Sequence, residues 1–407
     1  MVERVVVIEP MGFGGICHYT YNLCEALASR GIWTLLITAK NYELAARPRR
    51  FHLYPILSEW FRPELPSDRP DSANPESLLK KVRRRLNSAR VMLRIVAVVV
   101  RTGASVVHLQ WPIGPHDWIY VTVLRGLGRR IVYTAHDVLP HDHTHPDDVP
   151  QLRRLLKHVD RAILHSEENE RTFRQTFSEI SPPSNLVPHG HYFFFSEDAN
   201  HTAQTARAAL GIPQDAHVVL FFGTIRPYKG LADLINAVAR VRSRVADVRL
   251  LVAGYPFEEF GPYERAIASA GIRDCTAVHL GYHPAAEVAK FFRAADIVVL
   301  PYRSASQSGV AQLAFAFATP VIATRVGGLP EIVEEGHTGL LVDPGDDQAL
   351  ADAMVRLLED PQLRQSMGTR ASEIAASRYS WDRIAEMTLN VYDLAMERHS
   401  LQLPLHE

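Results

Sequence analysis

The sequence is poor in cysteine and has almost no net charge. Only three of its 407 residues are cysteine, namely Cys17, Cys24 and Cys275. Their odd number argues against a disulfide framework, and their spacing is not that of a metal site. We therefore expect a reducing, cytoplasmic setting. Lys and Arg total 44 against 45 Asp and Glu, so no overall positive field indicates binding to nucleic acid.

Long apolar runs are also absent. No stretch approaches the roughly 20 residues of a membrane span. The first residues, MVERVVVIEP, lead straight into a strand pattern, and we expect neither a cationic leader nor a cleavage site. A composition of 47% hydrophobic and 22% charged residues is typical of a globular protein. The length favours two or three domains of roughly 150 residues each.

The stretch VVLFFGTIRPYKG, residues 218–230, is the most informative part of the chain. Its apolar run predicts a buried parallel strand, after which Gly223 permits a sharp turn. Arg226 and Lys229 then follow where ligands bind, at the carboxyl end of a parallel strand. A guanidinium fork and an ammonium point charge suit a diphosphate. The alternative is a pair of surface cations without function.

A glycine loop follows the first predicted strand, Arg4–Ile8, and precedes a helix that should end at about Arg30. Gly12, Gly14 and Gly15 lie in this loop. Backbone N–H groups in such a turn can approach a phosphate or a sugar. The spacing lacks the full dinucleotide fingerprint, so it gives little support to a NAD site.

Two series of alternating strands and helices predict an α/β fold with two Rossmann-like, doubly wound domains facing a central cleft. We expect the first domain over 1–195 and the second over 205–380. A helix at about 382–400 should pack back on the first domain. Residues 191–215 should be loop-like apart from a short helix at 202–210.

A predicted helix at Lys80–Arg101 is strongly basic. Its cations before Val96 are Lys80, Lys81, Arg83, Arg84, Arg85, Arg90 and Arg94. One interpretation is a helix that covers the first sheet with a solvated basic face. The other is attachment to an anionic membrane, where each basic residue contributes about 1 kcal/mol. His141, His143 and His145 lie in a later segment that reads as a polar loop, because their spacing is not that of a zinc site.

Several segments together resemble a known family. FFGTIRPYKG, RAADIVVLPYRSASQSG and ATPVIATRVGGLPEIVEEGHTGLLVDPGD closely resemble the nucleotide-binding half of the retaining glycosyltransferases of family four, which have the GT-B fold. GFGGICHYTYNLCEALASRG, VVHLQW and YTAHD look like that family's first domain. The resemblance implies retaining sugar transfer from a nucleotide-sugar, which is a substrate and not a cofactor, without a bound metal. It suggests a role in polysaccharide biosynthesis.

The resemblance also implies roles for single residues. Arg226 and Lys229 match the diphosphate pair, Gly15 matches the phosphate-facing turn, and His136 matches the histidine beside the transferred sugar. We therefore predict His136, Arg226 and Lys229 as catalytic. Besides these two cations, the predicted donor-binding residues are Gly14, Gly15, Gly223, Gly254, Tyr282, Ser306, Gln307, Ser308, Gly309 and Glu331. No metal ligands are predicted.

The sequence departs from the family at one place. The family usually has two glutamates in the loop and helix before the PVIAT strand, and they grip donor hydroxyls. An ungapped count places them at Ala305 and Leu313, and a shift by one residue places them at Ser306 and Ala314. Neither alignment supplies a carboxylate. The segment instead offers neutral serine and glutamine groups at a helix N-terminus, which could bind a donor or merely cap the helix.

Two alternative classes of function remain, of which only the first follows from this departure. One is a catalytically silent binding subunit that partners an active transferase. Another is an epimerase or phosphorylase of the same architecture, although a phosphorylase would need a pyridoxal-binding lysine and none is marked. The expected partners are a nucleotide-sugar donor and an acceptor that is a glycan, a lipid-linked sugar or a small molecule. A further hypothesis is peripheral contact with the inner face of a membrane.

Overall fold

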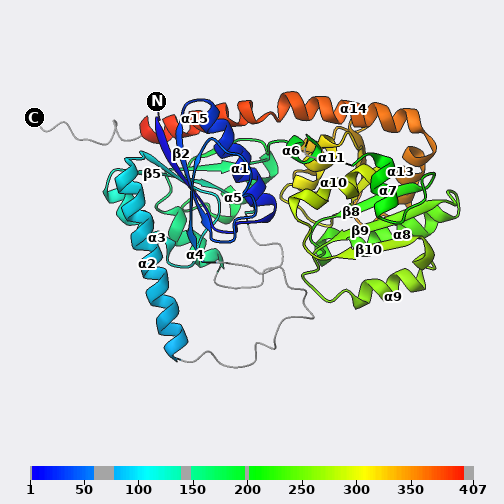
Figure 1. Cartoon of the computed structure of the whole chain (residues 1–407), viewed down its shortest axis with the longest axis horizontal. Helices are drawn as coiled ribbons and strands as arrows, with labels where there is room; N and C mark the ends of the chain where they lie inside the picture. Colours follow the sequence, from blue (N-terminus) through cyan, green and yellow to red (C-terminus); the bar gives the residue numbers. More distant parts are fainter. Residues whose placement is uncertain (1, 59–77, 139–147, 198–200, 398–407) are drawn as a thin grey trace, which may run out of the picture. The chain divides into compact units, whose positions relative to one another are not determined.

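The computed structural model describes residues 2–58, 78–138, 148–197 and 201–397. The chain forms two compact units (Figure 1). Unit 1 contains the described residues up to His189 and those from Trp381 onward. Unit 2 contains the described residues of Gly190–Ser380.

Unit 1 is built on a seven-stranded sheet with the order β3-β2-β1-β4-β5-β6-β7. The strands are β1 (Arg4–Glu9), β2 (Trp33–Ala39), β3 (His52–Leu57), β4 (Val106–Leu109), β5 (Arg130–Thr134), β6 (Arg161–Leu164) and β7 (Ser184–Leu186). Every neighbouring pair is parallel. The strand order reverses between β1 and β4, so the carboxyl ends of these two strands form the ligand-binding position of a doubly wound sheet.

Helices pack on this sheet. They are α1 (Gly14–Ser29), α2 (Leu78–Thr102), α3 (Asp117–Gly126), α4 (Asp148–Leu156), α5 (Glu167–Thr176) and α15 (Trp381–Glu397). Cys17, Leu23, Cys24 and Leu27 of α1 are fully buried, as expected for the core face of that helix. The C-terminal helix α15 packs against α1 and β5 (Figure 1).

Unit 2 is built on a six-stranded parallel sheet with the order β10-β9-β8-β11-β12-β13. The strands are β8 (His217–Phe222), β9 (Val248–Gly254), β10 (Thr276–Leu280), β11 (Ile297–Leu300), β12 (Val321–Thr324) and β13 (Gly339–Val342). The strand order reverses between β8 and β11. The predicted α/β fold with two doubly wound sheets is confirmed.

Both faces of the unit 2 sheet are covered. The helices are α6 (Phe193–Glu197), α7 (Ala203–Ala209), α8 (Leu231–Arg242), α9 (Gly261–Ser269), α10 (Ala285–Ala294), α11 (Gly309–Ala316), α12 (Leu329–Ile332), α13 (Asp347–Glu359) and α14 (Pro361–Arg378), with short 3-10 turns η2 (Pro227–Lys229) and η3 (Arg273–Cys275). Along β8, Val218 and Leu220 join one hydrophobic cluster while Val219 and Phe221 join another. Since successive strand residues point to opposite faces, each face has its own core.

The expectation that residues 191–202 are loop-like is wrong in part. Phe193–Glu197 form α6, where Phe194 and Phe195 are buried, and α6 packs against α10 and α11. A short aromatic run has neither helical nor strand periodicity, so only its tertiary contacts specify this turn of helix. The change from unit 1 to unit 2 comes at His189–Gly190, a few residues before the expected boundary.

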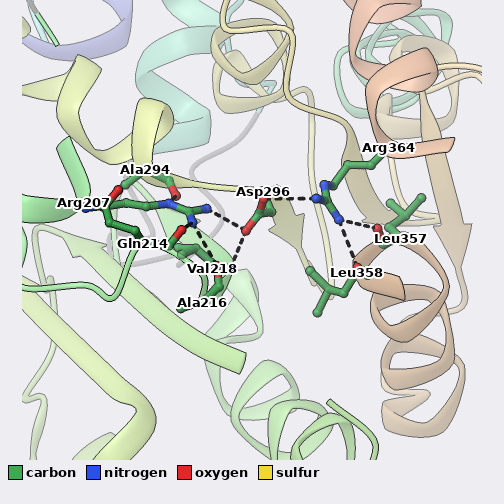
Figure 2. Close-up of polar contacts among 9 residues, drawn as sticks. All are labelled: Arg207, Gln214, Ala216, Val218, Ala294, Asp296, Leu357, Leu358 and Arg364. Carbon is green, nitrogen blue, oxygen red and sulfur yellow. Dashed lines mark hydrogen bonds and ion pairs between the residues drawn. The ribbon is translucent and has the colours of Figure 1, made fainter. Parts of the chain in front are cut away.

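An ion-pair network joins segments of unit 2 that are distant in the sequence (Figure 2). Asp296, just before β11, accepts hydrogen bonds from Arg207 Nη2 at 2.9 Å and from the Val218 N–H at 2.7 Å. Its other oxygen lies 3.5 Å from Arg364 Nη2. Arg364 also donates to the carbonyls of Leu357 and Leu358 at the end of α13. One carboxylate thus links α7, β8 and the junction between α13 and α14.

Candidate functional site

The ends of β8 and β9 meet at two predicted donor-binding glycines. Gly223 has a φ of 112° and Gly254 a φ of 158°. A Cβ on Gly254 would lie 1.6 Å from the carbonyl oxygen of Gly223, so no side chain fits there. The Gly281 N–H donates to the Gly254 carbonyl at 3.0 Å, which brings the loop of Tyr282 to the same edge. The structure therefore places Gly223, Gly254 and the Tyr282 loop together.

The two predicted cations each lie over an aromatic ring. Arg226 Cζ is 3.8 Å from the centroid of the Phe257 ring, and Lys229 Nζ is 3.8 Å from that of Tyr302. Both cations are half-buried. A cation on an aromatic face gains about 0.5–2 kcal/mol. The guanidinium has five N–H donors in a fixed fork, a geometry that matches the oxygens of a phosphate.

The loop that contains these cations is held by Arg303, whose side chain pairs with the buried carboxylate of Asp233. Arg303, after β11, pairs with Asp233 through two hydrogen bonds of 2.9 and 2.6 Å. The Arg303 N–H also donates to the Tyr228 carbonyl at 2.7 Å. Gly230 has a φ of 69°, and a Cβ there would meet the Pro301 carbonyl at 1.8 Å. Phe257, Tyr302, Asp233 and Arg303 were not predicted as site residues, because their partners are distant in the sequence.

The loop before α11 is fixed against the turn before α12. The Ser306 carbonyl accepts a hydrogen bond from the Gly328 N–H at 3.2 Å. A Cβ on Gly327 would lie 1.6 Å from the Ala305 carbonyl. Ser308 is the N-cap of α11, but its side chain makes no capping hydrogen bond. Its hydroxyl instead lies 3.4 Å from the Tyr302 hydroxyl.

The remaining predicted donor-binding residues of unit 2 follow the same turns. Gly309 is the first residue of α11, directly after Gln307 and Ser308. Glu331 is half-buried in α12, and its backbone carbonyl accepts a hydrogen bond from the Tyr379 hydroxyl at 3.4 Å. These residues follow the carboxyl ends of β11, which is next to β8 in the sheet, and of β12, the next strand along.

Two carboxylates shape the glycine loop of unit 1. Buried Glu9 accepts hydrogen bonds from the N–H groups of Met11 at 2.6 Å and Gly12 at 3.0 Å. Burial raises the pKa of Glu9 to about 7, although these bonds oppose the rise. The Gly14 N–H donates to a Glu43 oxygen at 3.4 Å, and His18 Nε2 lies 3.1 Å from the same oxygen. The N-terminus of α1 therefore lies beside a carboxylate of the protein itself, that of Glu43.

His136 lies in a buried chain of polar side chains in unit 1. Its Nε2 is 2.9 Å from Gln110 Oε1 and its Nδ1 is 3.1 Å from His165 Nε2. His165 Nδ1 donates to the Val187 carbonyl at 2.8 Å. Burial, and next the nearby His165, holds the pKa of His136 well below its usual value. The imidazole of His136 is therefore uncharged at neutral pH, and its two nitrogens contact the side chains of Gln110 and His165.

The described residues contain neither a metal-binding group nor a helix that could span a membrane. Among the residues that the structure describes, no three or more His, Cys, Asp or Glu side chains form a group able to hold a metal ion. Within the same residues, no helix has the length and apolar character needed to cross a bilayer. His141, His143 and His145 lie outside the described residues, as do the side chains of Lys80–Arg85.

Comparison with known proteins identifies the family of the chain. Residues 13–191 match the family described as Glycosyltransferase Family 4, and residues 216–360 match Glycosyl transferases group 1. A D-inositol 3-phosphate glycosyltransferase of Corynebacterium glutamicum is 31% identical over 315 residues, which are 73% of each chain.

Two solved structures have a similar fold. A sucrose-phosphate synthase of Thermosynechococcus elongatus superposes with a TM-score of 0.71 at 22% identity, covering 97% of this chain and 100% of its own. Anabaena HepE, solved in complex with UDP-glucose, superposes with a TM-score of 0.72 at 18% identity, covering 96% and 99%. The matched families, the similar enzyme and the shared GT-B fold agree, and the chain belongs to the family 4 glycosyltransferases.

Proposed function

We propose that this protein transfers a sugar, with retention, from a nucleotide-sugar to a hydroxyl acceptor, and that Arg226 and Lys229 hold the donor diphosphate. The observation that supports this most strongly is the pair of cations held on the rings of Phe257 and Tyr302. Both stand at the carboxyl end of β8, beside the point where the strand order reverses. Binding of UDP-glucose by the similarly folded HepE also supports a nucleotide-sugar donor.

The physical account of catalysis needs few groups. Breaking the bond between the sugar and the diphosphate builds negative charge on the leaving group, and fixed cations stabilise that charge as it develops. Held by aromatic rings, Arg226 and Lys229 need little reorganisation to do so. Because they neutralise the diphosphate, a divalent ion is not required. Retention is what the family resemblance implies, with the leaving phosphate accepting the proton of the acceptor.

The silent binding subunit remains the second candidate, because no carboxylate occupies Ala305, Ser306, Leu313 or Ala314. An assay of donor turnover separates the two. An active transferase should release UDP from UDP-glucose, slowly without acceptor and faster with one. D-inositol 3-phosphate and a lipid-linked sugar are the acceptors to compare, since the similar bacterial enzymes are named for the former. Binding of the donor without any turnover would favour the silent subunit.

Activity should persist in excess EDTA. Two side-chain cations already supply the positive charge that a divalent ion would otherwise provide at the leaving group. Initial rates in EDTA and in Mg²⁺ should agree within about twofold, in an assay of UDP release after removal of metals by chelation. Full loss of activity in EDTA, restored by a divalent ion, would contradict the metal-independent mechanism.

We also propose that unit 1 contacts an anionic membrane through α2 and α3, which pack against each other. Both helices expose apolar side chains: Leu93 is 70% exposed, Leu127, just after α3, 50%, and Val123 46%. Exposed arginines accompany them at 90, 94, 101 and 125. Apolar side chains bordered by cations are typical of surfaces that bind the interface of an anionic bilayer.

The double variant Arg90→Glu/Arg94→Glu should bind anionic vesicles at least about tenfold more weakly, since each basic residue contributes about 1 kcal/mol near such a surface. Co-sedimentation with phosphatidylglycerol vesicles at low salt measures this. The matched control is Arg356→Glu/Arg370→Glu, two exposed arginines of unit 2. Nucleotide binding should not change in either variant. Wild-type protein that fails to sediment would refute the membrane contact.

A further inference from the structure

Two adjoining hollows lie beside the C-terminal ends of α4 and α5 in unit 1. The larger has a volume of about 680 Å³ and the smaller a volume of about 380 Å³. Lys157, just after α4, and Ile180, in the turn after α5, line both hollows. Small-molecule sites in proteins typically have volumes of about 300–1,000 Å³. Each hollow is therefore large enough for a small ligand, and the shared wall makes them neighbouring parts of one surface.

The connection between α5 and β7 shapes the larger hollow. It contains two consecutive prolines, Pro182 and Pro183, which fix φ and disfavour a helix at the residue before them. The chain therefore runs extended to the start of β7 at Ser184. The Pro183 carbonyl accepts a hydrogen bond from the Ala162 N–H of β6 at 2.9 Å. This extended segment thus lies along the sheet and leaves space between itself and the end of α4.

Cations outnumber carboxylates around the hollows. The charged side chains that line the smaller hollow are Arg153, Arg154, Lys157 and Glu179. In the larger hollow Arg174 also contributes to the lining, but it pairs with Glu170 at 2.8 Å and adds no net charge. Within the described ranges of the chain, the other three cations have no carboxylate partner. Three cations and one lining carboxylate leave two positive charges.

The position of these cations at a helix end explains only part of the arrangement. Cations in the last turn of a helix interact favourably with its dipole. However, Lys157 follows Arg153 by four residues and Arg154 by three, and like charges at these spacings destabilise a helix. Arg153 is also held toward α5, because its Nη2 donates to the Thr176 carbonyl at 3.2 Å. An anion among these side chains would remove their mutual repulsion.

We propose that these hollows bind a phosphate monoester, with its phosphate held by Arg153, Arg154 and Lys157. Such a group carries about 1.5–2 negative charges at neutral pH, which matches the two positive charges of the lining. Guanidinium and ammonium groups both donate charge-assisted hydrogen bonds to phosphate oxygens. The exposed hydroxyl of Ser178 in the larger hollow is a further donor. Ile180, shared by both hollows, provides an apolar wall for the organic part of the ester.

This site differs from the places where the sequence predicted ligands. The end of α4 leads into β6 and the segment after α5 leads into β7, so the hollows border the amino ends of these strands. The glycine loop and His136 follow the carboxyl ends of β1 and β5, at the opposite edge of the sheet. The proposal therefore does not rest on the proposed function. The phosphate can belong to a soluble ester or to the headgroup of a lipid, and the chemistry of the contacts is the same.

Calorimetric titration of the full chain with glycerol 3-phosphate tests the soluble ester. UDP is present throughout to compete at the donor site. Arg154→Ala/Lys157→Ala should weaken binding by at least about tenfold, because it removes two charge-assisted hydrogen bonds. Ser178→Ala keeps the net charge and should weaken binding about threefold. The matched control Arg356→Ala/Arg370→Ala removes the same charge from exposed positions of unit 2 and should bind as wild type does.

Vesicles test the lipid headgroup. Co-sedimentation compares phosphatidylcholine vesicles that contain phosphatidic acid, a phosphate monoester, with vesicles of equal surface charge that contain phosphatidylglycerol, a diester. If a lipid is the source, Arg154→Ala/Lys157→Ala should lose at least about tenfold in binding to the phosphatidic acid vesicles, and less with phosphatidylglycerol. All the substituted residues of the hollows are exposed, so the unfolding temperature should stay that of wild type.

A loss confined to Arg154→Ala/Lys157→Ala and Ser178→Ala, with either probe, would support the site and identify its source. Wild-type protein that binds neither glycerol 3-phosphate nor phosphatidic acid vesicles would refute it. An equal loss in Arg356→Ala/Arg370→Ala, or no loss in Ser178→Ala, would show general attraction between charges in place of a built site. UDP binding should be the same in wild type and in all three variants, so a failure of this proposal leaves the donor site untouched.

Discussion

Replacing Arg226 or Lys229 by alanine should lower kcat/KM for glycosyl transfer by about 10²–10³-fold, equivalent to about 2.7–4 kcal/mol of transition-state stabilisation. In the proposed mechanism each cation faces a leaving group whose charge increases as the sugar departs, so the loss should fall mainly on kcat. Affinity for the free nucleoside diphosphate should fall as well, because that charge is present before the reaction. Initial-rate kinetics and calorimetric titration of the diphosphate give the two quantities.

The aromatic rings provide a finer test of the same assignment. Tyr302→Phe keeps the ring under Lys229 Nζ and should retain most of the activity, whereas Tyr302→Leu removes the ring and should lower it. The control Arg240→Ala removes an exposed arginine at the other end of α8, and its kinetics should equal those of wild type. If both alanine variants kept wild-type turnover and diphosphate affinity, these cations would not be the donor site.

Asp296→Ala should destabilise unit 2 by roughly 3 kcal/mol, the lower end of what breaking a buried ion pair costs. The side chains of Arg207, Asp296 and Arg364 are only 12%, 15% and 18% exposed. Without the carboxylate, two arginines are left partly buried without their charge partner, and the Val218 N–H loses its acceptor (Figure 2). A loss of this size lowers the unfolding temperature of a domain by roughly 6–12 °C.

The tryptophans allow this change to be assigned to one unit. All five tryptophans of the chain lie outside residues 190–380, so tryptophan fluorescence follows unit 1 and calorimetry follows both units. We expect the shift in the calorimetric transition of unit 2, which tryptophan fluorescence does not follow. Asp274→Ala is the control, since Asp274 pairs with Arg242 on an exposed surface and exposed pairs stabilise little. An equal shift in both variants would contradict the role of Asp296.

The order of elements and the place of the cations were predictable from the sequence. Continuous apolar runs such as Val218–Phe222 are typical of strands buried on both faces, and α8, the helix after Gly230, buries apolar residues at helical spacing. These features depend on residues close together in the chain. The sequence therefore predicted both doubly wound sheets and placed Arg226 and Lys229 at the carboxyl end of β8. Their binding of a diphosphate stays a prediction.

The partners of the site residues depended on tertiary structure. Arg226 lies on Phe257, Asp233 pairs with Arg303, and Glu43 faces the start of α1. Each contact joins residues that lie far apart in the sequence, so no local periodicity predicts it. Burial in the folded protein decides which of these contacts is maintained. Apart from α6, the sequence by itself determined the strands, helices and loop chemistry of this protein, since these follow from periodicity and turn residues. Only the tertiary structure decided which rings, carboxylates and amides surround those loops, since such contacts form when distant segments exclude water together.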